Sequence, residues 1–178
     1  MSASLTLRIN RAPVLTLWAA VVAERLGMPR DTALTVGHTL AGITAHAKGV
    51  RLGIYAPPEE RPREAPPPLP KGVKKVHEVA LLGRLIHVAD TPDGPRALSK
   101  GELAKPESVE RYLQSKFGSA LEVVRTEMER LAASFDPKDL DHEGFHLYEQ
   151  FRPEVPPDER GWGAKGVLDI AKIRALAR

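Results

Sequence analysis

Apolar residues recur every three or four positions over residues 13–26 and again over residues 32–47, and this spacing predicts two α-helices. Pro13 suits the first turn of the first helix, and Gly27 suits its end. Asp31 is the predicted N-cap of the second helix. Because so few residues separate the two helices, we expect them to form an antiparallel hairpin.

Small residues on both helices predict that the hairpin packs closely. Alanine or glycine recurs at every fourth position, as Ala19, Ala23 and Gly27 on the first helix and as Ala33, Gly37, Ala41 and Ala45 on the second. Side chains this small form a smooth ridge along which another backbone can approach. We therefore expect a large side chain at Gly37 to separate the helices.

A proline-rich stretch and a β-hairpin are predicted next. Seven prolines fall within residues 56–72, which excludes a helix or a central strand there and predicts an extended strap or linker. Residues 76–89 are rich in Val, Leu and Ile, and the sequence Thr-Pro-Asp-Gly at residues 91–94 is typical of a turn. We expect residues 85–89 to pair with residues 96–99 in an antiparallel sheet.

Helical periodicity returns towards the C-terminus. The predicted helices span residues 106–117, 119–135, 140–151 and 167–177. Ser119 and Glu122 have the spacing of a capping box at the start of the second of these helices. A short edge strand is predicted at residues 5–9, ahead of the first helix of the chain. The fold class predicted is therefore α+β and mainly α-helical, with an N-terminal helical hairpin, a small antiparallel β-hairpin and C-terminal helices.

The length of 178 residues suits one domain, residues 1–178. We expect a helical hairpin lobe at residues 1–55, the proline-rich strap at residues 56–72, and a lobe with the β-hairpin and the remaining helices at residues 73–178. Hydrophobic residues make up 42% and charged residues 28% of the chain, which is typical of a soluble globular protein. No apolar run reaches the ~18 residues of a membrane span. We expect a cytoplasmic protein with no membrane partner.

The charge is distributed unevenly between the two halves of the chain. Residues 1–100 contain 14 Lys and Arg against 8 Asp and Glu, whereas residues 101–178 contain 12 against 15. A basic half beside an acidic half suits a surface that binds a polyanion, although an ordinary solvated surface explains the same asymmetry.

Residues 22–42 resemble a helix-turn-helix motif. Ala23 and Gly27 have the spacing that such motifs use, and Met28 occupies the apolar turn position. Close packing of the hairpin explains Ala23 and Gly27 equally well. The resemblance implies that the second helix presents Thr32, Thr35, His38 and Thr39 to a DNA groove, with Arg30 on phosphate.

Two further segments combine cations with glycine. Lys48 and Arg51 lie at the end of the hairpin, and Trp162 with Lys165 lies in a glycine-rich stretch near the C-terminus. Lys165 could hold a phosphate and Trp162 could stack on a base, although a Trp162 buried in the core is the alternative. Together with the basic first half, these residues predict a non-catalytic protein that associates with DNA or RNA and needs no cofactor.

His142, Glu143 and His146 form an H-E-x-x-H motif, which makes a zinc-dependent hydrolase the alternative function. On a helix the two histidines could share a zinc ion, with Glu143 as general base. Several neighbouring residues are uncharged, which resembles the flanks in zincin metalloproteases: Leu140, Gly144, Phe145, Leu147 and Tyr148. Asp139 and Asp141 depart from that pattern, and no third ligand follows at a familiar spacing. The alternative is a helix whose polar face carries these residues and whose apolar face includes Tyr148. A third possibility is an interaction module that forms a homodimer through the small-residue hairpin. Whether the protein is an enzyme stays open.

Overall fold

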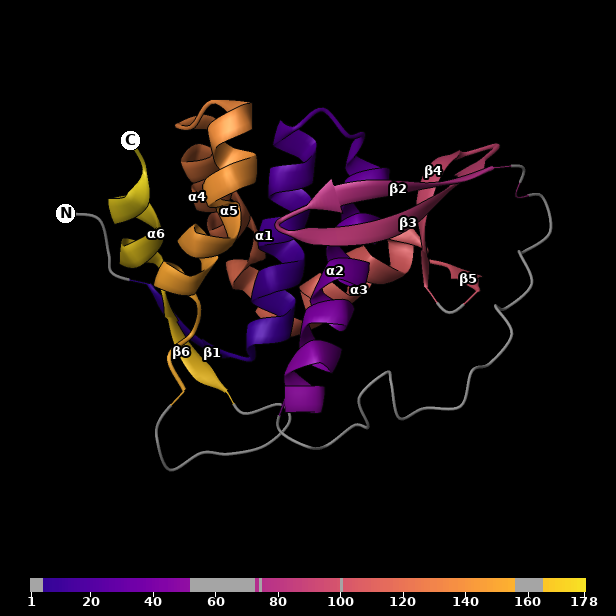
Figure 1. Cartoon of the computed structure of the whole chain (residues 1–178). Coiled ribbons are helices and arrows are strands. Elements are labelled where there is room, and N and C mark those ends of the chain that lie inside the picture. Colours follow the sequence, from indigo (N-terminus) through magenta and orange to yellow (C-terminus); the bar gives the residue numbers. More distant parts are fainter. Residues whose placement is uncertain (1–4, 52–72, 74, 100, 156–164) are drawn as a thin grey trace.

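The computed structural model describes residues 5–51, 73, 75–99, 101–155 and 165–178, with the backbone alone for residues 48–51. Helices make up most of these ranges, and a small antiparallel sheet lies at each side of them (Figure 1). This arrangement confirms the predicted α+β, mainly helical fold. Within the same ranges, no helix combines the length and the apolar character that crossing a bilayer requires. The predicted strap at residues 56–72 lies outside the described residues.

The predicted hairpin consists of α1 (Arg11–Arg25) and α2 (Arg30–Arg51). The first of these helices ends in a Schellman motif, because the N–H of Met28 donates to the carbonyl of Ala23 at 3.1 Å and Gly27 has φ +107°. Asp31 lies inside the first turn of α2, so its predicted role as N-cap is wrong. Every residue of 13–23 is buried, which makes α1 the central helix of the molecule.

The close approach of the two helices is confirmed at Gly37. A Cβ atom on Gly37 would lie 2.7 Å from the carbonyl oxygen of Thr16 and 2.8 Å from the nitrogen of Ala20. These are backbone atoms of α1, so a side chain at this position cannot be accommodated by a change of rotamer. The helices touch through backbone, as the small-residue pattern predicts.

The larger sheet packs on α2. Its strands are β2 (Val76–Leu81), β3 (Arg84–Thr91), β4 (Gly94–Ser99) and β5 (Glu102–Leu103), paired in chain order. Val88 lies opposite Ala97 in the β3–β4 pair, which confirms the predicted pairing of residues 85–89 with residues 96–99. Leu82 and Gly83 have φ +49° and +79° and form the tight turn between β2 and β3.

The second sheet joins the two ends of the described chain. The predicted edge strand is β1 (Thr6–Ile9), and it pairs with β6 (Gly166–Asp169). The predicted helix at residues 167–177 is therefore wrong over its first three residues, since α6 (Ile170–Leu176) begins only after β6. Burial in β6 alternates: Leu168 is fully buried, whereas Val167 is 44% exposed. Backbone pairing with β1 fixes these residues as a strand.

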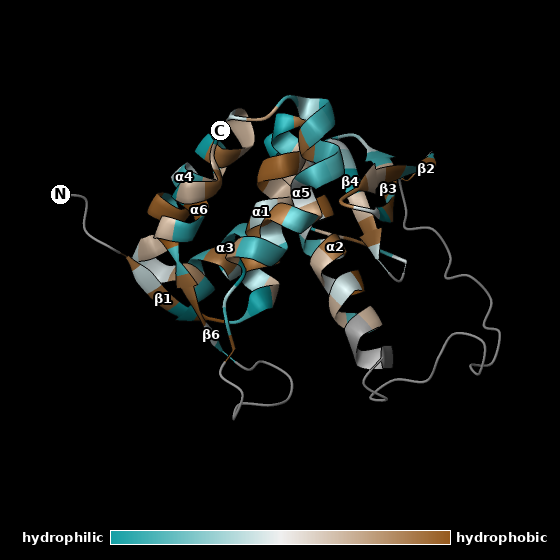
Figure 2. Ribbon diagram, turned by 60° about the vertical axis from the view of Figure 1, so that its left-hand side comes forward, coloured by the Kyte–Doolittle hydropathy of each residue, from teal (hydrophilic) through white to brown (hydrophobic). Residues whose placement is uncertain are grey.

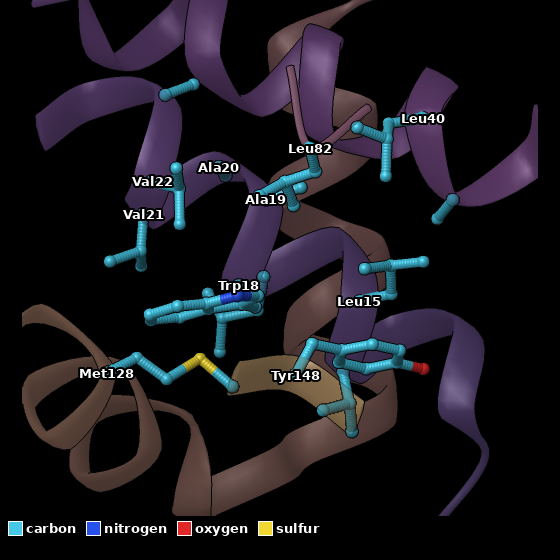
Figure 3. Packing of buried hydrophobic residues seen from close by; sticks show 14 of the residues in the cluster. Leu15, Trp18, Ala19, Ala20, Val21, Val22, Leu40, Leu82, Met128 and Tyr148 are labelled. Carbon is cyan, nitrogen blue, oxygen red and sulfur yellow. The ribbon is translucent and has the colours of Figure 1, made fainter. Parts of the chain in front are cut away.

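The remaining helices are α3 (Pro106–Phe117), α4 (Leu121–Ala133) and α5 (Pro137–Phe151). Residues Gly118–Ala120 form a 3-10 turn before α4. The N-cap of α4 is therefore Ala120, whose methyl side chain cannot accept a hydrogen bond, and the predicted capping box at Ser119 is wrong. Trp18 of α1 is fully buried and lies near Met128 of α4 and Tyr148 of α5 (Figure 3). The indole N–H of Trp18 donates to the carbonyl of Gly144 at 2.9 Å, which ties α1 to α5.

Candidate nucleic-acid interface

The structure places Thr32 and Thr35 in the interior, where they attach α2 to β4. Thr32 is 4% exposed and donates its hydroxyl to the carbonyl of Pro95 at 2.8 Å. Thr35 is fully buried; its hydroxyl donates to the carbonyl of Thr32 and accepts the backbone N–H of Ala97 at 3.0 Å. The expectation that these two side chains face a DNA groove is therefore wrong, because both are occupied in fixing the sheet.

His38 lies at the surface between α2 and α3. Its ring packs edge-on against Tyr112 with centroids 5.1 Å apart, and the resulting partial desolvation lowers the pKa of His38. A histidine that loses its proton more readily is a poor cation for phosphate at neutral pH. With β4 on one side and α3 on another, the first half of α2 cannot enter a groove as a recognition helix, and the buried Thr39 agrees with this.

Basic residues gather instead at the opposite end of the hairpin, which we call the basic end. Because α1 and α2 are antiparallel, the end of α2 and the start of α1 lie at the same end of the hairpin, with α2 extending beyond the start of α1. The pairing of Ile9 with Gly166 places the start of β6 beside the start of α1. The last turn of α2 and the start of β6 both lie at the lower side of the molecule in Figures 1 and 2. The basic end comprises Arg8, Arg11, Lys48, Arg51, Arg152 and Lys165.

Arg11 and Arg152 form the centre of the basic end. The Nε of Arg11 donates to the carbonyl of Pro153 at 3.0 Å, which holds the first residue of α1 against the end of α5. Desolvation lowers the pKa of Arg11, and the positive charge of Arg152 lowers it further. The repulsion between these two positive charges is reduced when an anion binds near them.

The start of α1 adds to this preference for anions. Its N-cap Asn10 makes no side-chain capping bond, and the first turn contains no acidic residue. The helix dipole and the first N–H groups therefore meet no negative side chain of their own helix. Two carboxylates, Glu149 and Glu154, belong to the segment that ends beside Arg11, and Glu154 is bonded to Lys172 at 2.5 Å, which lowers the pKa of Glu154.

The other predicted contact residues are placed less favourably. Arg30 is exposed at the far end of α2, roughly 30 Å from Arg51 at the helical rise of 1.5 Å per residue. Trp162 lies outside the described residues. Lys165 is exposed immediately before β6. The structure thus brings Lys48, Arg51 and Lys165 to one end and leaves Arg30 apart.

The H-E-x-x-H motif lies on α5 with its histidines turned to solvent. His142 and His146 are exposed and Glu143 is half-buried, whereas Gly144, Leu147 and Tyr148 form the inner face with the rest of the apolar residues of α5. Among the residues that the structure describes, no group of three or more His, Cys, Asp or Glu could hold a metal ion. The described residues therefore supply no third protein ligand for the predicted zinc centre, which needs one.

The small-residue face of the hairpin is used within the chain. Ala19, Ala23 and Ala33 are fully buried, Ala41 is 4% exposed, and Gly37 contacts the backbone of α1. Gly27 is exposed and Ala45 is half-buried, so part of the small-residue pattern stays at the surface, and homodimerisation through the hairpin stays a prediction.

Comparison of this chain with protein-family models, with curated proteins and with solved structures gave no match. Its site must therefore be interpreted from its own geometry. Sequence reasoning missed Arg8, Arg11 and Arg152, because nothing local distinguishes them from other surface arginines. For Arg8 and Arg11 the sequence signal is the overall positive charge of residues 1–100, whereas Arg152 lies in the acidic half and has no such signal.

Proposed function

We propose that the protein binds nucleic acid without catalysis, through the phosphate backbone, at the basic end. The observation that carries this proposal is the pairing of β1 with β6, which brings Lys165 to the same end of the molecule as the last turn of α2 with Lys48 and Arg51. These cations come from segments more than a hundred residues apart in the sequence.

The chemistry of the basic end favours phosphate over bases. Guanidinium groups bind phosphate through charge-assisted hydrogen bonds, and Arg11 and Arg152 lie near enough to each other for their charges to interact. The described residues of this end include no exposed aromatic side chain on which a base could stack. Binding through phosphates is independent of sequence and releases counterions, so its affinity falls steeply with salt.

Fluorescence anisotropy with labelled DNA duplex, single-stranded DNA and RNA over a salt series tests the proposal. The triple variant Lys48→Gln, Arg51→Gln, Lys165→Gln removes three cations of the basic end. The matched control Arg30→Gln, Lys105→Gln, Lys138→Gln removes three exposed cations where α2, α3 and α5 begin, with the same change in net charge.

The basic-end variant should bind duplex DNA more weakly, and the slope of log affinity against log salt should become shallower by roughly 2–3, because each lost phosphate contact contributes about 0.9. The control should bind as the unmodified protein does. Equal losses in both variants would show that only net charge matters, and no binding at low salt would refute the function.

A further inference from the structure

His142 and His146 are set out for metal binding even though no protease-like centre surrounds them in the described part of the chain. Both are exposed on α5, one helical turn apart, where Cβ atoms lie about 5–6 Å from each other. Two imidazoles at this spacing can bind one transition-metal ion together. In the described ranges neither ring has a hydrogen-bond or ion-pair partner, whereas His87 is bonded to Glu78 at 3.2 Å. Their ring nitrogens are therefore available to a metal.

The backbone that carries the two histidines is held in place. Asp136 caps α5 by accepting the N–H of Lys138 at 2.9 Å, and the carbonyl of Gly144, midway between the histidines, is bonded to Trp18. A Cβ on Gly144 would clash with the side chain of Leu82, so the inner face of α5 is pressed against the β2–β3 turn. This contact fixes the rotation of the helix and directs the histidines outward. Binding a metal needs only the two side chains to become ordered.

The surroundings of the pair attract cations. Asp139 and Glu149 are exposed one turn before and one turn after the histidines, on the same side of α5. Figure 2 shows hydrophilic residues along this helix. One cation, the exposed Lys138, lies four residues before His142 on this side, so the two carboxylates leave this side net negative, which raises the local concentration of a divalent ion.

We propose that His142 and His146 form a two-ligand surface site for a divalent transition metal that prefers imidazole, with Cu²⁺ bound more tightly than Ni²⁺ or Zn²⁺. The described residues supply no third His, Asp or Glu to the site, so water completes the coordination. The site lies on the exposed side of α5, before Arg152 at the end of that helix, and shares no residue with the basic end.

Titration of the untagged full-length chain with CuCl₂, NiCl₂ or ZnCl₂ in a calorimeter tests the proposal. We expect one ion per chain, affinity in the order copper above nickel and zinc, and weaker binding at acidic pH because a protonated imidazole cannot bind metal. The nitrogen couplings in the electron paramagnetic resonance spectrum of the copper complex report imidazole ligands directly.

His142→Ala and His146→Ala should each weaken metal binding about tenfold or more. Removing a residue that only hydrogen-bonds to a metal ligand already has an effect of that size, and here the ligand itself is removed. The double variant His77→Ala, His87→Ala is the control, because these two exposed histidines are directed at Asp90 and Glu78. Circular dichroism checks that each variant folds. Unchanged binding in both single variants, or equal losses in the control, would overturn the proposal. If one ion bound per two chains and this binding disappeared in either single variant, His142 and His146 would still be the ligands. A second copy of the chain would then supply the further ligands.

Discussion

The substitution Gly37→Ala tests the close contact on which the helical hairpin depends. The added Cβ would lie 2.7 Å from the carbonyl oxygen of Thr16, 2.8 Å from the nitrogen of Ala20 and 3.2 Å from its Cα, where ordinary contacts begin at 3.4 Å. All three atoms belong to the backbone of α1, the central helix. Relief therefore requires α1 and α2 to separate by about half an ångström or more, against the packing of the whole core.

Two effects of opposite sign decide the outcome. Alanine is favoured over glycine inside a helix by about 1 kcal/mol, partly because glycine leaves the unfolded chain more freedom. Overpacking a well-filled core costs about 1–3 kcal/mol, and a clash with immobile backbone belongs at the upper end. We expect Gly37→Ala to lower the free energy of unfolding by about 1–2 kcal/mol and the melting temperature by roughly 2–8 °C.

Gly42→Ala is the matched control, because Gly42 lies on the same helix, is exposed, and has nothing within 4 Å of its would-be Cβ. This variant should be more stable than the unmodified protein by about 0.5–1 kcal/mol. Urea denaturation followed by circular dichroism measures both, and an unchanged dependence on urea shows that both unfold in the same way. If Gly37→Ala were as stable as Gly42→Ala, the helices could not be in backbone contact as described.

Four further substitutions test the core, a partly buried ion pair and the response to pH. Trp18→Phe should lower the free energy of unfolding by about 2–4 kcal/mol, because it leaves a cavity and removes the buried hydrogen bond from the indole to the carbonyl of Gly144; unchanged stability in urea would contradict this. Glu110→Gln should destabilise far more than Glu122→Gln when both are melted side by side, since Glu110 binds the 7% exposed Arg125 through two bonds of 2.8 and 3.1 Å, whereas Glu122 is 81% exposed and 3.4 Å away. Burial raises the pKa of Tyr148 from 10.0 to about 12, so the unfolded chain ionises first and stability should fall between pH 10 and 12. Tyr148→Phe should show a smaller fall in urea midpoint over that range, and an equal fall would refute the assignment.

Elements with strong local signals could be predicted from the sequence. Pro106 opens α3 and Gly118, with φ +58°, follows its end, as the pattern indicates. The turn at residues 91–94 sets the pairing of β3 with β4. Such signals act within a few residues of the chain, so they do not depend on contacts with distant segments.

The state of β6 could not be predicted in this way. Val167, Ile170, Ile173 and Leu176 have helical spacing, but the first of them is held in a strand by Arg8 on one side and Glu154 on the other. Both partners are distant in sequence. Long-range backbone pairing overrides a local helical pattern, because each backbone group gains a hydrogen bond that the pattern does not encode.

The helix-turn-helix interpretation failed for a related reason. Thr32 and Thr35 are polar, and polar residues on a helix are usually taken as exposed. Here their hydroxyl groups satisfy the carbonyl of Pro95 and the N–H of Ala97 at the edge of β4, which lie in the interior and need partners. A sequence shows that a hydroxyl is present but not that a strand requires it.

The two candidate sites differ in how far the sequence could define them. The inner face of α5 is visible in the spacing of Leu140, Gly144, Leu147 and Phe151, and this spacing alone directs His142 and His146 to solvent. The same spacing therefore favours a surface pair over an enclosed zinc centre. The basic end has no such signature, because Arg11 and Arg152 stand 141 residues apart and come near each other only where Arg11 bonds to the carbonyl of Pro153 at the end of α5. For that reason the nucleic-acid affinity of the Lys48, Arg51 and Lys165 variant must be compared with that of its charge-matched control. A larger loss in the variant shows that binding depends on the surface that the fold creates. An equal loss shows that it depends only on net charge, which the composition already gives.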